Sequence, residues 1–141
     1  MMTSPTGKVI TVPLCHKLVL TTDGQNGVWN YVDVTLPEVE DWGPFLMGIT
    51  AHTRCENMTT NVKWKVVFWW SVDGRNWSAT PVDLFTEVAY SSSPVDAIKT
   101  EYNTVNTFGL KMKWGLAVQN ASGTAFERTV VTVALAFKFL T

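Results

Sequence analysis

The sequence predicts an all-β domain, an antiparallel two-sheet sandwich of about eight strands with jelly-roll-like topology. Apolar residues recur at every second position in several long segments, as in strands that bury one face. Turn-forming residues separate these segments every ~8–15 residues, and no stretch has the pattern of a long amphipathic helix. We expect residues 1–141 to form a single domain, with residues 1–7 as a flexible N-terminal arm.

The composition is poor in charge. Hydrophobic residues make up 46% of the 141 residues and charged residues only 16%, against a usual share of roughly a quarter. Low charge and seven tryptophans favour apolar surface that is covered by another chain or a ligand. A thick core between two sheets accounts for them equally well. The formal net charge of −1 gives no electrostatic footprint for nucleic acid.

No targeting or membrane segment is predicted. The first residues carry no apolar run of signal-peptide length, and no stretch approaches the ~20 apolar residues that cross a membrane. The two cysteines, Cys15 and Cys55, lie far apart in the sequence and form no metal-binding motif. We expect buried free thiols, and a disulfide is the alternative if their strands are neighbours.

The first third of the chain predicts four extended segments. Lys8–Pro13 and Lys17–Thr22 are two short pieces interrupted at the proline, and a loop rich in Gly, Asn and Asp follows. Val28–Leu36 alternates, with a mainly apolar face and an opposite face that carries aromatic and polar residues. Phe45–Arg54 places its apolar residues inward and its polar residues, His52 among them, outward.

The stretch Asn61–Ser78 predicts a central core strand followed by a turn. Its even-numbered positions are apolar as far as the turn: Val62, Trp64, Val66, Phe68, Trp70 and Val72. The odd face is mixed, because Val67 and Trp69 lie between lysines and a serine. A strand that is apolar on both sides at its centre is either covered by another layer or open to a partner. Asp73-Gly74 predicts a tight hairpin turn, after which Trp77–Thr80 begins a return strand.

The last third predicts two long strands. Before them, Val82–Tyr90 is a looser extended segment, and Asp96–Tyr102 is either a short helix or part of a long loop. Phe108–Val118 and Val131–Phe139 alternate along their length, and the polar loop between them predicts an antiparallel hairpin. Small residues recur on the second face of these two strands, which suits close packing against a flat surface: Gly109, Gly115, Ala117, Ala134 and Ala136.

The sequence holds no motif typical of catalysis, and no cofactor is expected. The GxSxG, HExxH and phosphate-loop patterns are absent, and the carboxylates do not pair at a spacing that predicts a site. His52 is expected to be a solvated strand residue, and His16 faces away from its neighbour Cys15 on a strand. Asp73, Asn76 and, as a third candidate, Asp83 offer oxygen atoms for calcium near the turn, but a tight turn prefers the same residue types. We therefore expect neither an enzyme nor a metal site.

Five large aromatic residues are candidates for contact with a partner or a ligand, because they lie on second faces or near loops: Trp29, Tyr31, Trp42, Trp69 and Trp77. Trp64, Trp70 and Trp114 are assigned to the core. Exposed aromatic rings are enriched in protein interfaces, and their planes also stack on sugar rings. The five residues therefore suit either a second protein chain or a glycan.

Two resemblances narrow the function. Ser71-Val-Asp-Gly-Arg-Asn-Trp77 resembles the strand–turn–strand S-x-D-G-x-x-W of discoidin-like and carbohydrate-binding sandwiches, in which this segment is mainly a structural hairpin. As a small, charge-poor sandwich with an extended arm and a long C-terminal hairpin, the whole chain resembles in type the structural proteins of bacteriophage particles. That resemblance implies a non-catalytic capsid decoration, minor capsid or head–tail protein, made in the host cytoplasm and located in the virion. It would self-associate and dock onto other virion proteins, without nucleic-acid or membrane partners; the alternative is a carbohydrate-binding or receptor-binding module.

Overall fold

The computed structural model describes residues 9–34, 46–84, 87–102, 111–123 and 126–139. These residues form nine β-strands and no helix: β1 (Val9–Thr21), β2 (Trp29–Asp33), β3 (Leu46–Glu56), β4 (Val62–Ser71), β5 (Val82–Asp83), β6 (Val88–Ala89), β7 (Val95–Tyr102), β8 (Lys111–Asn120) and β9 (Arg128–Phe139). Accordingly, the described part of the chain contains no helix that could span a membrane. The expected arm over residues 1–7 lies outside the described residues.

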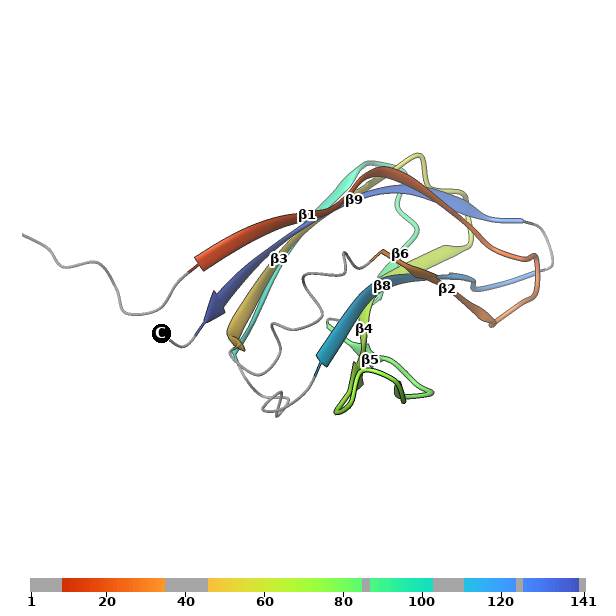
Figure 1. Cartoon of the computed structure of the whole chain (residues 1–141). Helices are drawn as coiled ribbons and strands as arrows, with labels where there is room; N and C mark the ends of the chain where they lie inside the picture. The colour runs from red at the N-terminus through yellow and green to blue at the C-terminus, as the bar shows by residue number, and fades with distance from the viewer. Residues whose placement is uncertain (1–8, 35–45, 85–86, 103–110, 124–125, 140–141) are drawn as a thin grey trace, which may run out of the picture.

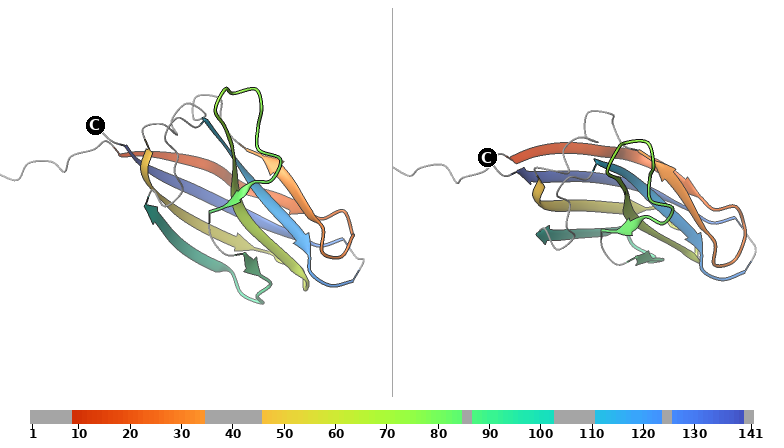
Figure 2. Two further views of the ribbon diagram at one scale, coloured as in Figure 1. Left: turned by 90° about the horizontal axis from the view of Figure 1, so that it is seen from below. Right: turned by 60° about the horizontal axis from the view of Figure 1, so that its bottom comes forward.

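The strands form two antiparallel sheets that lie face to face (Figures 1 and 2). The four-stranded sheet has the order β1-β9-β3-β7, and the five-stranded sheet has the order β2-β8-β4-β5, with β6 also pairing with β4. β5 and β6 pair with successive parts of β4 and act as one interrupted strand. Apart from the step from β4 to β5 and β6, each strand is followed by one in the opposite sheet, which is the double Greek-key order of a jelly roll. The predicted all-β, two-sheet sandwich is confirmed.

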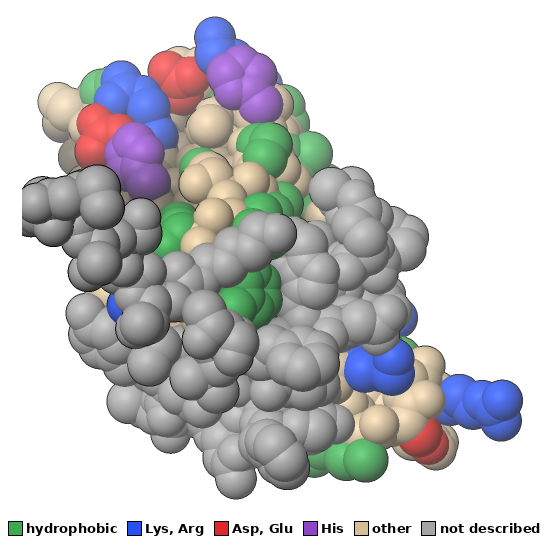
Figure 3. All heavy atoms as spheres, turned by 60° about the vertical axis from the view of Figure 1, so that its left-hand side comes forward, with side chains coloured by type: hydrophobic (Ala, Val, Ile, Leu, Met, Phe, Trp, Pro, Cys, Tyr) green, Lys and Arg blue, Asp and Glu red, His purple; other side chains and the backbone are tan. Residues whose placement is uncertain are grey.

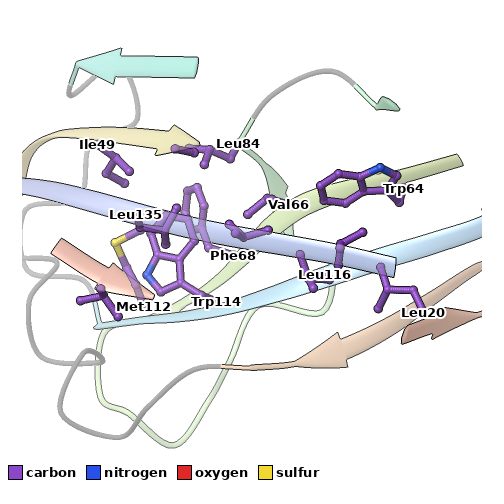
Figure 4. Packing of buried hydrophobic residues seen from close by; sticks show 14 of the residues in the cluster. Leu20, Ile49, Trp64, Val66, Phe68, Leu84, Met112, Trp114, Leu116 and Leu135 are labelled. Atoms are coloured by element: carbon purple, nitrogen blue, oxygen red, sulfur yellow. The ribbon is translucent and has the colours of Figure 1, made fainter. Parts of the chain in front are cut away.

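The core fills the space between the sheets with the predicted alternating residues (Figure 4). Trp64 and Trp114 are fully buried. The Trp114 ring centroid lies 5.2 Å from that of Phe68 on β4 and 5.7 Å from that of Phe137 on β9. Trp114 therefore joins the two sheets, and each such aromatic pair contributes about 0.5–1.5 kcal/mol beyond the area it buries.

β8 and β9 do not form the hairpin that the sequence predicts. β8 lies between β2 and β4 in one sheet, whereas β9 lies between β1 and β3 in the other. Both strands carry a complete apolar face, and across the sandwich the two faces pack against each other instead of lying side by side. Alternation identifies which face of a strand is buried, but it does not distinguish a partner in the same sheet from one in the opposite sheet.

β7 replaces the short helix or long loop expected over Asp96–Tyr102. Its residues pair with β3 from Cys55↔Val95 to Gly48↔Tyr102. Helix propensity is a weak preference, and pairing with β7 satisfies the backbone groups on the edge of β3 that β9 leaves open. Ile98 consequently points outward and is 75% exposed.

The core ends before the apolar pattern of β4 does. Trp70 still pairs with Met112 but is 39% exposed, and Val72, beyond the strand, is 72% exposed, so neither belongs to the core. After Ser71 the chain turns into a loop, in which the Ser71 side chain accepts a hydrogen bond from the Gly74 N–H at 2.9 Å. Trp77–Thr80 is not a strand, and the return strand is the two-residue β5.

β1 is a single strand, not two pieces interrupted at Pro13. It pairs with β9 along its length, with register shifts between Pro13 and Cys15 and again between Cys15 and Leu18. These irregularities absorb the residues that a proline and its neighbours cannot place in a regular ladder. Proline is tolerated here because β1 is an edge strand of its sheet.

Candidate functional site

Most of the predicted contact residues gather on the outer face of the sheet formed by β2, β8 and β4. Trp29 and Tyr31 lie on β2, Trp69 lies on β4, and Trp77 lies in the loop that follows β4. The strand side chains point away from the core because neighbouring residues alternate faces. We call the surface of these four residues the aromatic face. Trp42 lies outside the described residues.

Gly115 of β8 allows the aromatic face to pack closely. Gly115 pairs with Asp33 on β2 and with Val67 on β4, so its missing side chain leaves a gap in the middle of the face. Trp69 fills this gap, because a β-carbon on Gly115 would lie 2.4 Å from Cζ3 of Trp69 and 2.7 Å from the Val32 carbonyl oxygen. No larger residue fits without displacing its neighbours. The predicted small-residue face of β8 is therefore packed, at this point, by the protein's own tryptophan.

Trp69 and Tyr31 contact each other across β8. Their ring centroids are 5.8 Å apart and the ring planes meet at 71°, an edge-to-face arrangement. Val67 and Ala117 belong to the same outer face and are nevertheless 0% exposed. The strand that is apolar on both sides is thus covered by side chains of this chain. Tyr31 itself stays 45% exposed, so the covering layer still presents aromatic surface outward.

Lys65 of β4 connects three strands across the aromatic face. Its ammonium lies 4.1 Å from the centroid of the Trp29 ring on β2 and 3.0 Å from Oδ1 of Asp83 on β5. The Lys65 side chain is only 11% exposed, which strengthens both interactions relative to water. These contacts engage one plane of the Trp29 ring.

A groove of about 340 Å³ opens beside Trp69 on this face. Its aromatic walls are Tyr31, Trp69 and Trp77, and its polar lining is Asp33, Ser78 and Lys113. The Lys113 ammonium lies 4.4 Å from the Trp77 ring centroid, which positions both side chains at the rim. Aromatic walls with a carboxylate, a hydroxyl and an ammonium suit an occupant with flat apolar surface and polar groups at its edge.

The Asp73 carboxylate accepts hydrogen bonds within the loop after β4. It accepts hydrogen bonds from the backbone N–H groups of Asn76 and Arg75, each at 2.8 Å, and from the Asn76 side chain and Ser71 hydroxyl. These bonds hold the pKa of Asp73 well below its ordinary value, the Asn76 backbone bond contributing most. Gly74 supplies the positive φ angle, 74°, that the loop needs. Among the described residues, no group of three or more His, Cys, Asp or Glu side chains is placed to hold a metal ion.

Both cysteines are free thiols, as the sequence predicts. Cys55 is fully buried beside Met58, with 3.4 Å between the two sulfur atoms, and Cys15 is partly buried with its thiol 3.7 Å from the Val131 carbonyl oxygen. Burial raises the pKa of both thiols, which disfavours the reactive thiolate. The cysteines therefore fill space in the sandwich.

The polar residues of the groove were not identified from the sequence. Asp33 and Lys113 lie on the predicted second faces of their strands, but only the register across β2, β8 and β4 brings them beside Trp69. Ser78 reaches the groove because its backbone N–H donates to the Trp70 carbonyl oxygen at 2.9 Å, which closes the loop back onto β4. Cross-strand register of this kind is not encoded in the spacing of a single strand.

No family model matches the sequence, and no curated protein matches it. Solved structures do match. The infectious bursal disease virus VP2 subviral particle matches with a TM-score of 0.65 and 6% identity over 95% of this chain. The Gx strain of that virus gives 0.67 and 9% over 97%, and the T=1 particles derived from the virus give 0.66 and 6% over 95%. This chain shares its fold with a viral particle protein. It spans about a third of each matched chain, 32–33% of the length.

Proposed function

We propose that this protein is a non-catalytic structural subunit of a virus particle, which acts through subunit–subunit contacts. The observation that carries the proposal is the jelly roll itself, which resembles viral particle proteins over 95–97% of this chain. Jelly rolls are a frequent architecture of viral capsid domains and also of lectin domains. On this proposal the chain is located in the virion and its partners are further copies of itself and other virion proteins.

The aromatic face is our candidate for the contact surface. Large aromatic residues are enriched at the centre of protein interfaces. Trp29, Tyr31 and Trp69 lie on one sheet surface, and Trp77 of the following loop lines the same groove as Tyr31 and Trp69. Rigid aromatic side chains lose little conformational entropy on association. We include Trp42 in the proposal, on the sequence pattern alone. In its narrower form, the proposal assigns the chain to a bacteriophage as a decoration, minor capsid or head–tail component, supported by the resemblance in type.

Self-association is the testable core of this proposal. Size-exclusion chromatography with light scattering should give a species that is a multiple of the 15.7 kDa chain. Tyr31→Ser should shift that species toward the monomer, because Tyr31 is exposed at the centre of the proposed contact. The matched control is Phe126→Ser, which removes an exposed aromatic side chain (71% exposed) outside the aromatic face. A wild-type protein that stays monomeric up to ~1 mM would overturn self-association.

Glycan recognition is the second candidate function, and the groove is the observation that favours it. Its volume of about 340 Å³ is in the range of small-molecule sites, and its lining combines aromatic rings with polar groups. A glycan array identifies candidate sugars, and titration of the intrinsic tryptophan fluorescence then measures their affinity. Trp77→Ala should abolish the response, whereas Trp70→Ala, on the same strand–loop unit but outside the groove lining, should leave it unchanged. The absence of any response across the array would rule this function out for the groove.

A further inference from the structure

A trough of about 310 Å³ lies on the outer face of the other sheet, opposite to the aromatic face. Its floor is formed by Thr132 and Ala134 of β9, whose small side chains leave the centre of the sheet surface low. β1 and β3 flank β9 on either side and carry longer, nitrogen-bearing side chains. Figure 3 shows both histidines, in purple, with basic and acidic side chains beside them on this side of the molecule. We call this feature the histidine trough.

A bulge in β1 builds one wall of the trough. Cys15 pairs with Val133 and Leu18 pairs with Val131, so two residues of β1, His16 and Lys17, stand opposite the single residue Thr132. In a regular strand such neighbours would point to opposite faces, but here both line the trough.

The bulge also carries backbone strain that its neighbours support. Lys17 has a φ angle of 51°, a left-handed conformation that is unfavourable for a lysine, and its backbone N–H donates to Oγ1 of Thr132 at 3.0 Å. Bulges and strained residues of this kind recur at functional sites.

β3 builds the other wall, with His52 and Arg54 at alternate positions and Glu56 at its end. Asp96 of β7 lies behind this wall. Its carboxylate contacts the Arg54 guanidinium at 2.5 Å and lies 3.6 Å from Nε2 of His52. The pairing fixes Arg54 from the side of β7 and leaves guanidinium N–H groups directed elsewhere, because arginine has five donors. Among the described residues, Lys17 makes no ion pair.

The charged groups of the histidine trough are distributed over both walls. Lys17 lies on the β1 wall and Arg54 on the β3 wall, with Glu56 at the end of β3 and Asp96 behind that wall. Cations therefore line both sides of the floor, and the Asp96 carboxylate contacts Arg54 from outside the trough.

We propose that the histidine trough binds a tetrahedral oxyanion, a phosphate or sulfate group. Lys17 and His16 donate from one wall, His52 and Arg54 from the other, and the Thr132–Ala134 floor leaves room for the anion between them. Charge-assisted hydrogen bonds that converge from two sides on one anion are the geometry that recognises such groups. The proposal is independent of self-association, because the trough and the aromatic face lie on opposite sheets.

The test is an NMR titration of the ¹⁵N-labelled protein with sodium sulfate at constant ionic strength. Sulfate is a tetrahedral oxyanion that carries no hydrogen-bond donor of its own. We expect saturable shift changes centred on Lys17, His52 and Arg54. Shift changes spread evenly over all basic residues would mean general screening and would overturn the proposal.

Variants distinguish binding at the trough from non-specific attraction by the positive charge of this face. Lys17→Ala should weaken sulfate binding at least about threefold, whereas Lys138→Ala should not change it. Lys138 lies on β9 beyond the trough, so its removal lowers the charge of the same face by the same amount. Equal losses in the two lysine variants would contradict the proposal, and spectral dispersion reports folding in each case.

Parallel titrations with inorganic phosphate and phenyl phosphate identify the source of the oxyanion. Binding of either supports the proposal, and the tighter ligand shows whether a free ion or an ester is preferred. Binding of neither overturns it.

Discussion

Both outer faces of the sandwich have small residues on their central strands. Neighbouring side chains cover these residues on one face and leave them accessible on the other. On β8, Gly115 is covered by Trp69, and Ala117 is fully buried. On β9, Ala134 stays accessible as the floor of the histidine trough. Small residues on an outer face therefore do not by themselves predict a docking surface. Their role depends on whether an adjacent strand supplies a ring long enough to cross them.

The faces also differ in how their charged residues are held. On the aromatic face, Lys65 is nearly buried between the Trp29 ring and Asp83. On the opposite face, Arg54 and Asp96 form an ion pair while both remain about half exposed. Charges in the first setting contribute to stability, whereas those in the second remain available to a ligand.

The sharpest test of this contrast is to enlarge a small residue on each face. Gly115→Ala should lower the free energy of unfolding by about 2–3 kcal/mol, because its new methyl group would meet Trp69 and the Val32 carbonyl oxygen at 2.4 and 2.7 Å. Ala134→Val should change it by less than about 0.5 kcal/mol, since a trough lies above that position. Urea denaturation at pH 7 measures both. Similar losses would show that the two central strands are packed alike.

The second test compares two lysines on the same face of β4. Lys65→Met should cost about 1–2 kcal/mol, because it removes a shielded ion pair and a cation–π contact together. Lys63→Met removes a pair with Glu87 whose two side chains are about a third exposed, and should cost less than about 0.5 kcal/mol. Chemical denaturation gives both values. If the two variants lose equal stability, the burial of Lys65 has no energetic consequence.

Much of the fold could be predicted from the sequence, since alternation reports burial directly. Trp64 and Trp114 belong to the core as predicted, and His52 is exposed as predicted. Pairing between distant strands was not predictable in the same way. The periodicity of β8 and β9 is compatible with a hairpin. In the structure β8 pairs with β2 and β4, whereas β9 pairs with β1 and β3 in the other sheet.

For the candidate surfaces too, the sequence predicts which face a residue lies on but not which residues meet across strands. The spacing placed Trp29, Tyr31 and Trp69 on second faces, but the contact of Tyr31 with Trp69 depends on the register across Gly115. The histidine trough was missed because a regular strand would turn His16 and Lys17 to opposite faces. The bulge that turns both to one face is a register shift between Cys15 and Leu18 against β9, which the spacing of β1 alone does not predict.

The smallest difference that we predict between paired variants concerns the backbone strain at Lys17. At a φ angle of 51°, glycine is favoured over any residue with a β-carbon, so Lys17→Gly should be about 1 kcal/mol more stable than Lys17→Ala. Both variants lose the ammonium, and both keep the backbone N–H that donates to Thr132. Their difference in the free energy of unfolding, measured from urea midpoints, therefore isolates the cost of the backbone conformation.

Two variants of equal stability would mean that the bulge relaxes in solution and carries no strain. If glycine is the more stable and sulfate binding falls equally in both, the lysine is retained at a cost in stability for its charge. The other described non-glycine residue with a positive φ angle is Asn57, at 53° directly after β3, so among the described residues neither belongs to the aromatic face.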